Sequence, residues 1–364
     1  MRQDLESEAE RARSYPDPYP DGWYALARSE EVQGEPVTVR AVGRELVLFR
    51  RASDGTVGAL DAHCPHMGAH LGLGTVEAGC VRCPFHGWRF RTDGSVATIP
   101  YADRVPMSHA ARSYQVDELH GFVCVYLSRS DARCGETSAP YRLRHVAGID
   151  EGELELRGDL DFGVVRLHLV EFAENSADLQ HFQPLHGEMR LPYLGTKLPL
   201  IRVRHSASWE PDASEPHVAW FHDHAVLLAF GRVIPNTGAH ARIRLDGPGS
   251  FVSFDFSVRD LGRIVMFQTH TPLAPLAQQV RFRWYAEPRV PRLLVKHVIG
   301  SWIAQWKQDI AIWETKVYRE RPLLVREDGP VHALRRWYSQ FYGGESTRGG
   351  GRSEVGRDAA GSAE

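Results

Sequence analysis

The 364-residue sequence has few cysteines, few lysines and no long uncharged apolar run. Its five cysteines, an odd number, make a poor disulfide framework for a chain of this size and suit metal binding better. No apolar run approaches the roughly 18 residues that a membrane-spanning helix needs. The charged first residues contain no apolar core of a secretion signal. We therefore expect no transmembrane segment and a cytoplasmic protein.

The sequence also lacks a strong charge of either sign and a nucleotide-binding glycine motif. Its formal net charge is -3, so we expect no nucleic-acid partner. Gly72-Leu-Gly74 has no third glycine and does not form the G-x-G-x-x-G pattern of a dinucleotide-binding turn. We therefore expect the chain to bind neither NAD nor flavin by itself.

Composition shifts divide the chain into four segments. Residues 1–18 are charged and then rich in proline, and they are predicted to form an arm. Residues 19–135 contain short apolar runs typical of strands, at 37–39, 46–49 and 122–127, and are predicted to form an all-β domain. Residues 136–345 mix strand and helix patterns and form a second predicted domain. The Gly-rich residues 346–364 are predicted to be disordered.

The second domain begins with two ambiguous elements and ends with a clear one. Residues 164–170 resemble a strand, and a helix is predicted from Glu174 until Pro184 interrupts it. The best predicted helix runs from 293 to about 319, because its apolar residues recur at spacings of three and four. Further β-type runs are predicted at 218–233, 241–245, 251–258, 263–270 and 280–286.

One metal-binding pattern lies in the all-β domain. Cys64-Pro-His66 is followed after sixteen residues by Cys83-Pro-Phe-His86. A Rieske [2Fe–2S] cluster needs two thiolates on one iron and two imidazoles on the other, and each short motif supplies one of each. The same Cys₂His₂ set could instead hold a structural zinc ion. Cys80, Cys124 and Cys134 we interpret as packing or surface thiols.

A second pattern lies in the second domain. His181 and His186 stand five positions apart, which is about 140° of rotation on an ideal helix. Both can reach one metal only if the helix ends between them, and Pro184 gives it a reason to end. Two histidines and one carboxylate make the facial triad of non-haem Fe(II) oxygenases. Asp309 is the candidate carboxylate because it lies on the apolar predicted helix, and Glu314 is its rival.

With both patterns in place, residues 20–345 resemble the oxygenase subunits of Rieske non-haem iron oxygenases. The family pattern Asn-x-x-Asp-x-x-His-x4-His is met by Asn175, Asp178, His181 and His186. The resemblance implies an α+β chain: an N-terminal all-β Rieske [2Fe–2S] domain over 19–135 and a helix-grip (START-like) catalytic domain with an antiparallel sheet over 136–345. It also implies a mononuclear Fe(II) centre, O₂ as co-substrate, and electrons from an external NAD(P)H-dependent reductase or a ferredoxin.

Three further segments, at 20–24, 309–313 and 335–342, resemble the cholesterol 7-desaturase branch, which is related to the 3-ketosteroid 9α-hydroxylase oxygenases. This implies O₂-dependent hydroxylation or desaturation of a bulky, hydrophobic ring substrate, with a sterol as one candidate. Eukaryotic desaturases of this branch carry an N-terminal membrane segment, which we do not find here. Arylamine N-oxygenases and tailoring enzymes of secondary metabolism share the metal motifs and are the alternative.

The family resemblance also implies a homotrimer in which the cluster of one subunit faces the catalytic iron of the next. Asp178 would then bridge a cluster histidine, His86, to the iron ligand His181. Two non-enzyme hypotheses are a lipid-binding helix-grip module with a structural zinc, and a Rieske electron carrier without catalytic iron.

Overall fold

The computed structural model describes residues 2–105, 110–129, 139–190, 197–235, 237–258 and 262–343. The predicted disordered tail at 346–364, the predicted domain boundary at 135/136 and Cys134 all lie outside the described residues. Within the described ranges no helix is long and apolar enough to cross a membrane.

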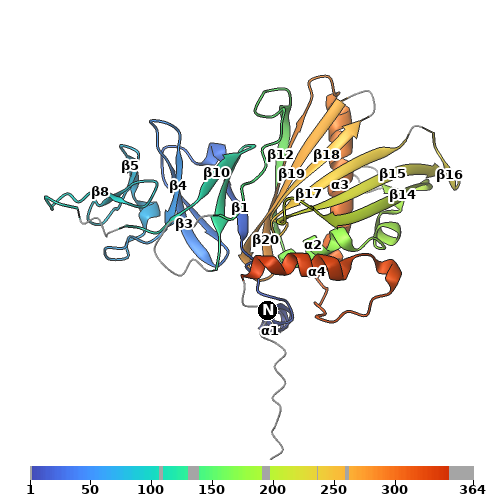
Figure 1. The fold of residues 1–364 in the computed structure, drawn as a ribbon, viewed down its shortest axis with the longest axis horizontal. Helices are drawn as coiled ribbons and strands as arrows, with labels where there is room; N and C mark the ends of the chain where they lie inside the picture. Colours follow the sequence, from blue (N-terminus) through green and yellow to red (C-terminus); the bar gives the residue numbers. More distant parts are fainter. Residues whose placement is uncertain are drawn as a thin grey trace, which may run out of the picture.

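The N-terminal half consists of short antiparallel strands in three small sheets, coloured blue to cyan in Figure 1. The sheet orders are β1-β11-β10, β2-β3-β4-β9 and β5-β6-β7-β8. The strands are β1 (Gly22–Arg28), β2 (Val37–Ala41), β3 (Arg44–Arg50), β4 (Val57–Asp61), β5 (Thr75–Glu77), β6 (Cys80–Arg82), β7 (Arg89–Phe90), β8 (Val96–Thr98), β9 (Ser113–Tyr114), β10 (Val116–Leu119) and β11 (Phe122–Leu127). The predicted strands at 37–39, 46–49 and 122–127 are confirmed, because their alternating or continuous apolar residues form the buried core of this half.

The C-terminal half is one large antiparallel sheet in the order β12-β20-β19-β18-β17-β15-β14-β13, with β16 paired to β15. Helix α3 lies along one face of this sheet (Figure 1). The elements are β12 (Glu155–Val165), α2 (Leu169–Ala177), β13 (Glu188–Arg190), β14 (Lys197–Pro211), β15 (Val218–Ala229), β16 (Arg232–Val233), β17 (Ala239–Asp246), β18 (Phe251–Val258), β19 (Gly262–Ala274), β20 (Ala277–Ala286), α3 (Arg292–Trp313) and α4 (Val331–Tyr338). The predicted α+β class with an antiparallel catalytic sheet is confirmed.

Helix α3 closes the sheet into a shell because its aromatic side chains pack on the inner strands. The ring of Trp302 lies 4.7 Å from that of Phe254, and the ring of Trp306 lies 5.4 Å from that of Phe282. The helix ends at Trp313, six residues earlier than predicted. There the Thr315 hydroxyl donates to the carbonyls of the last turn and so competes with further helix.

The two ambiguous elements before the histidine pair were predicted wrongly. Strand β12 ends at Val165, and α2 begins at Leu169 because the His168 ring accepts the N–H of Val170 at 3.1 Å and caps the helix. The helix ends at Ala177, well before Pro184. Pro184 instead lies within a short π-helical turn, Phe182–His186.

Strand β14 and helix α1 were not predicted as regular structure. In β14, Ile201, Val203, Ala207 and Trp209 alternate with arginine and serine, a strand signal that the prediction missed. The N-terminal arm contains helix α1 (Arg2–Arg13), which lies below the catalytic half in Figure 1. Arg11 of this helix donates to the carbonyls of Trp313 and Glu314 at 3.1 and 2.5 Å, and so ties the arm to the end of α3.

Candidate metal centres

The first candidate centre is built by two loops that share one backbone geometry. In both, the cysteine N–H donates to the carbonyl five residues later at 2.8 Å, and the glycine four residues later donates back to the cysteine carbonyl. Those glycines, Gly68 and Gly87, have φ of +76° and +72°, a region that glycine adopts without steric cost. The two segments, Cys64-Pro-His66 and Cys83-Pro-Phe-His86, therefore fold into matching turns, in which Cys64 and Cys83 occupy equivalent positions.

The four side chains of these loops separate into a buried pair and a half-buried pair. The thiols of Cys64 and Cys83 are almost fully buried, and the imidazoles of His66 and His86 lie nearer the surface. The two rings are 4.7 Å apart at an angle of 75°. The buried Nδ1 of His66 has no hydrogen-bond partner. Burial, together with the neighbouring Cys83 thiol, raises the pKa of Cys64 to about 11, so the thiolate form needs a nearby positive charge such as a metal.

Among the described residues, one group of three His, Cys, Asp or Glu side chains brings its ligand atoms within 4.8 Å of one another: His181, His186 and Asp309.

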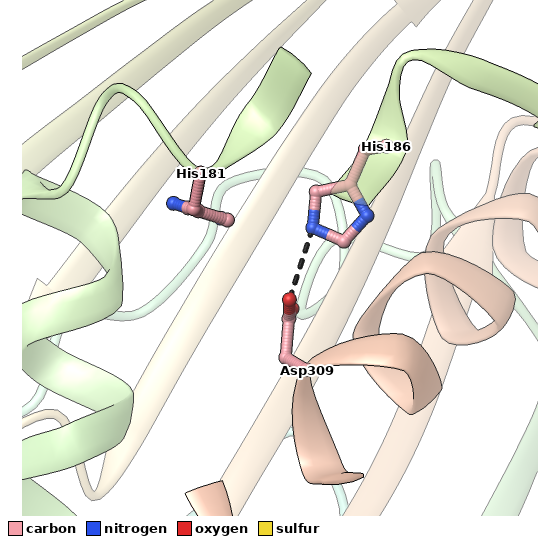
Figure 2. Close-up of side chains that lie close together, drawn as sticks. All are labelled: His181, His186 and Asp309. Atoms are coloured by element: carbon pink, nitrogen blue, oxygen red, sulfur yellow. Dashed lines mark ion pairs between the residues drawn. The ribbon is translucent and has the colours of Figure 1, made fainter. Parts of the chain in front are cut away.

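The second candidate centre joins the two histidines of the C-terminal half to helix α3. Figure 2 shows His186 pointing at Asp309, with His181 beside them on the loop that follows α2. His186 Nε2 lies 3.1 Å from Asp309 Oδ1, and the two imidazole rings are 5.3 Å apart and nearly perpendicular. The expected convergence of the two histidines is therefore found, although α2 ends before both of them and not between them.

The atoms of this centre are those of a metal site. Asp309 Oδ1 and His186 Nδ1 are buried and have no hydrogen-bond partner, which is destabilising in a protein interior unless another group binds them. Burial lowers the pKa of His181 and so favours the neutral imidazole, the form that binds metals. His181 Nδ1 donates to the carbonyl of Asp178 at 2.5 Å, which leaves Nε2 available to a metal.

Asn175 and Asp178 lie on either side of His181. The amide of Asn175 lies 3.2 Å from His181 Nε2. The Asp178 carboxylate accepts the N–H groups of Gln180 and His181 at 3.2 and 3.3 Å, and its side chain is 48% exposed. Asp178 therefore fixes the ring of His181 through its carbonyl while its carboxylate faces solvent.

The rival carboxylate, Glu314, lies elsewhere. Its Oε1 accepts the N–H of Arg166 at 3.2 Å, and it borders a surface hollow together with Arg11 of α1. The structure thus brings Asp309, and not Glu314, to the histidines. One turn of helix separates the two residues, and sequence alone could not tell which face of α3 meets the histidine loop.

An aromatic cavity opens beside the second centre. Its empty space, counted together with the open mouth, is about 540 Å³. Apart from the residues already described, its lining consists mainly of aromatic and aliphatic side chains: Phe172, Phe182, Phe221, Ile243, Leu245, Val252, Phe254, Trp302 and Trp306. From the sequence, the catalytic sheet and the helix around Trp302–Trp313 were expected to line the substrate cavity, and its lining residues come from both. The contributions of β15, β17 and β18 depend on which face of each strand is turned inward.

Comparison with known proteins agrees with both centres. The sequence profile of the Rieske [2Fe-2S] domain matches residues 22–113, and that of the 3-ketosteroid 9alpha-hydroxylase C-terminal domain matches residues 141–342. A cholesterol 7-desaturase from Hemicentrotus pulcherrimus is 34% identical, over 91% of this chain and 71% of that protein. A probable 3-ketosteroid-9-alpha-monooxygenase oxygenase component from Rhodococcus rhodochrous is 31% identical, over 90% of this chain and 81% of that protein.

Among solved structures, dicamba monooxygenase bound to dicamba superposes with a TM-score of 0.63 at 19% identity, over 90% of this chain and 98% of that one. At this identity the likeness concerns the fold, and it agrees with the two-part architecture. The two domain profiles and the extended identity to the desaturases go further and confirm the expected family. This oxidoreductase therefore belongs to the Rieske non-haem iron oxygenases, with a C-terminal domain of the 3-ketosteroid 9α-hydroxylase type.

Proposed function

We propose that this chain is the terminal oxygenase of a multi-component monooxygenase that hydroxylates or desaturates a bulky, apolar ring substrate of the sterol class. The observation that carries the proposal is the convergence of His181, His186 and Asp309 beside an aromatic cavity. The relatives named for cholesterol and 3-ketosteroids suggest the substrate class. No observation favours the arylamine alternative.

Separate groups of residues in this chain would hold the cluster, the iron and the substrate. Cys64, His66, Cys83 and His86 would hold the [2Fe–2S] cluster, and His181, His186 and Asp309 would hold a mononuclear Fe(II). When bound, the cluster supplies electrons and the iron supplies the activation of O₂. The aromatic wall binds an apolar substrate and excludes water from the reacting carbon.

Electrons must come from outside the chain, because we find no nucleotide-binding motif in the sequence. An NAD(P)H-dependent reductase or a ferredoxin is the proposed partner, and a cytoplasmic location is part of the proposal. An electron carrier alone would not need the buried group His181, His186 and Asp309. The match to the Rieske [2Fe-2S] domain over residues 22–113 favours a cluster over the structural zinc of a lipid-binding module.

We further propose a homotrimer in which the cluster loops of one subunit meet the Asp178 surface of the next. In Figure 1, β5 and β8 beside the cluster loops lie at the far left, and α2 and α3 lie at the right, so the two centres belong to different halves of one chain. Next to the cluster ligands, Met67 and Phe85 are 66% and 60% exposed. Exposed apolar side chains of this kind favour a protein surface against these loops. The exposed carboxylate of Asp178 would then reach His86 of a second copy.

The proposal is tested by anaerobic purification with quantitation of iron and acid-labile sulfide, followed by turnover of cholesterol with a surrogate reductase. We expect three irons and two sulfides per chain, and an oxidised or desaturated sterol that depends on O₂. Zinc in place of iron, or two irons with no turnover of any sterol or arylamine, would contradict it.

A further inference from the structure

A second pair of buried polar side chains lies on the inner face of the catalytic sheet, outside both metal centres. His205 of β14 and Asp223 of β15 form a hydrogen bond of 2.8 Å between His205 Nδ1 and Asp223 Oδ2. Their side chains are only 5% and 8% exposed. A carboxylate accepts and does not donate, so the proton between them belongs to His205 Nδ1.

Both members of this pair retain an unused polar atom. His205 Nε2 and Asp223 Oδ1 are buried and have no hydrogen-bond partner. Polar atoms of the protein interior are almost always paired, and an exception calls for a missing partner or a function. Since Nδ1 carries the ring proton, Nε2 of the neutral ring is a hydrogen-bond acceptor. A ligand group that pairs with it must therefore donate a hydrogen bond.

The pair lies directly behind the cavity. The ring of Phe182, which lines the cavity, lies 5.6 Å from the ring of His186 on one side and 5.1 Å from that of His205 on the other. Phe221, another lining residue, precedes Asp223 by two positions and therefore shares its face of β15. The phenyl ring of Phe182 thus separates the candidate iron ligand His186 from the His205–Asp223 pair, which we call the dyad.

The strand positions around the dyad carry small side chains. Ala225 lies opposite His205 across the β14–β15 pair, and Ala207 and Ala241 lie opposite Asp223 on the two neighbouring strands. All three alanines are partly exposed, although they are on the inner face. The aromatic wall near the metal triad therefore gives way to small side chains beside the dyad, where Ala207 and Ala241 pack against the core of the catalytic half.

We propose that His205, positioned by Asp223, binds a hydroxyl group of the substrate at the end that lies away from the iron. This inference rests on the proposed function and narrows its substrate class to hydroxyl-bearing polycycles, such as a sterol alcohol, over their ketones. The hydroxyl donates to His205 Nε2. The apolar body lies along Phe182, Phe221 and the tryptophans of α3, and this placement fixes which carbon faces the iron.

The test measures binding of three ligands that differ at one carbon: 5α-cholestan-3β-ol, 5α-cholestan-3-one and 5α-cholestane. Trp302 and Trp306 line the cavity, so their fluorescence in the metal-loaded enzyme reports occupancy. We expect the wild-type enzyme to bind the alcohol roughly tenfold more tightly than the ketone or the hydrocarbon. His205→Phe should bind all three alike. The control His222→Phe, on the outer face of the same strand as Asp223, should keep the wild-type preference.

The substitution Asp223→Asn tests the proposal in an independent way. The asparagine amide can donate to His205 Nδ1, which moves the ring proton to Nε2 and turns the anchor from acceptor into donor. We expect this variant to prefer the ketone to the alcohol, a reversal that lost packing alone would not produce. An alcohol preference that survives in His205→Phe, or equal binding of all three ligands by the wild-type enzyme, would overturn the inference and leave the sterol proposal intact. A wild-type enzyme that binds none of the three would overturn both.

Discussion

His186 Nε2 lies 3.1 Å from Asp309 Oδ1, yet Asp309 Oδ1 has no hydrogen-bond partner. The two atoms are close but form no hydrogen bond, an arrangement expected for two ligands of one metal. Helix α3 and the turn that ends at His186 meet at this point, although His186 and Asp309 are 123 positions apart in the sequence. A metal bound there would join the helix to the histidine loop as well as take part in the chemistry.

Asp309→Ala should lose the mononuclear iron and keep the cluster. Removing a residue that hydrogen-bonds to a metal ligand weakens metal binding by about 10–100-fold. Removing a ligand itself should therefore weaken metal binding by roughly 100-fold or more. Iron per chain should fall from three to two, and the Rieske EPR signal should be unchanged. Glu314→Ala is the matched control on the same helix and should retain all three irons. A normal iron content in Asp309→Ala would remove Asp309 from the metal site.

The sequence predicted the residues of both candidate centres better than the path of the chain between them. The spacing of C-P-H and C-P-x-H is local, because each loop presents its own cysteine and histidine whatever surrounds it. The pairing of His181 with His186 was likewise expected, but its cause was not. The helix ends at Ala177 because Asp178 departs from helical geometry and gives its carbonyl to His181, a side-chain preference that outweighs the proline signal.

Long-range contacts account for what the sequence did not reveal. Strand β14 alternates Ile201, Val203, Ala207 and Trp209 with arginine and serine, so its strand character is encoded locally and was missed. Its pairing with β15 over eleven positions, in contrast, is encoded by no local signal. The same holds for the choice between Asp309 and Glu314, which depends on the rotation of α3 against the sheet.

Arg335→Ala should destabilise the catalytic half. Arg335 Nε of α4 lies 2.5 Å from Glu174 Oε1 of α2, and both side chains are mostly buried. Burial already raises the pKa of Glu174, and without the guanidinium its charge would keep only the more distant ammonium of Lys316, whose Nζ lies 3.9 Å from Glu174 Oε2. The free energy of unfolding should fall by about 3 kcal/mol. Urea denaturation measures it, with Arg336→Ala, an exposed neighbour on α4, as the control. Glu174→Gln in the Arg335→Ala background should recover part of the loss, and a purely additive double variant would contradict the pairing.

His120 should make the protein less stable in mild acid. Burial lowers the pKa of His120 to about 4, against about 6.5 in an unfolded chain. Below pH 6.5 the unfolded state therefore binds a proton that the folded state does not, so the stabilisation present at pH 7 is lost progressively as the pH falls towards 4. Between pH 7 and pH 5 this residue should account for about 2 kcal/mol of lost unfolding free energy.

The measurement for His120 is urea denaturation at both pH values. His120→Gln keeps an acceptor for the Val146 N–H that His120 Nε2 binds at 3.1 Å, but it cannot take up the proton. Its loss of stability between pH 7 and pH 5 should be smaller than that of the wild-type protein by the same amount. The exposed His332→Gln serves as the control and should follow the wild-type curve. Equal pH dependence of His120→Gln and wild type would exclude His120 as the source.

Asp178→Asn should slow electron transfer between the two centres without removing either. The carbonyl of Asp178, which orients His181, is unchanged by the substitution, and the asparagine Oδ1 can still accept the N–H groups of Gln180 and His181. What is lost is the negative charge and one acceptor on a side chain that is 48% exposed. In the proposed trimer that acceptor takes an N–H from His86 of the next subunit, so its loss should slow reoxidation of the cluster roughly tenfold or more. Single-turnover mixing of cluster-reduced protein with O₂ and substrate measures this rate, while iron content and mass in solution confirm that the centres and the assembly persist. Reoxidation at the wild-type rate in an intact trimer would show that the path between the centres does not pass through Asp178.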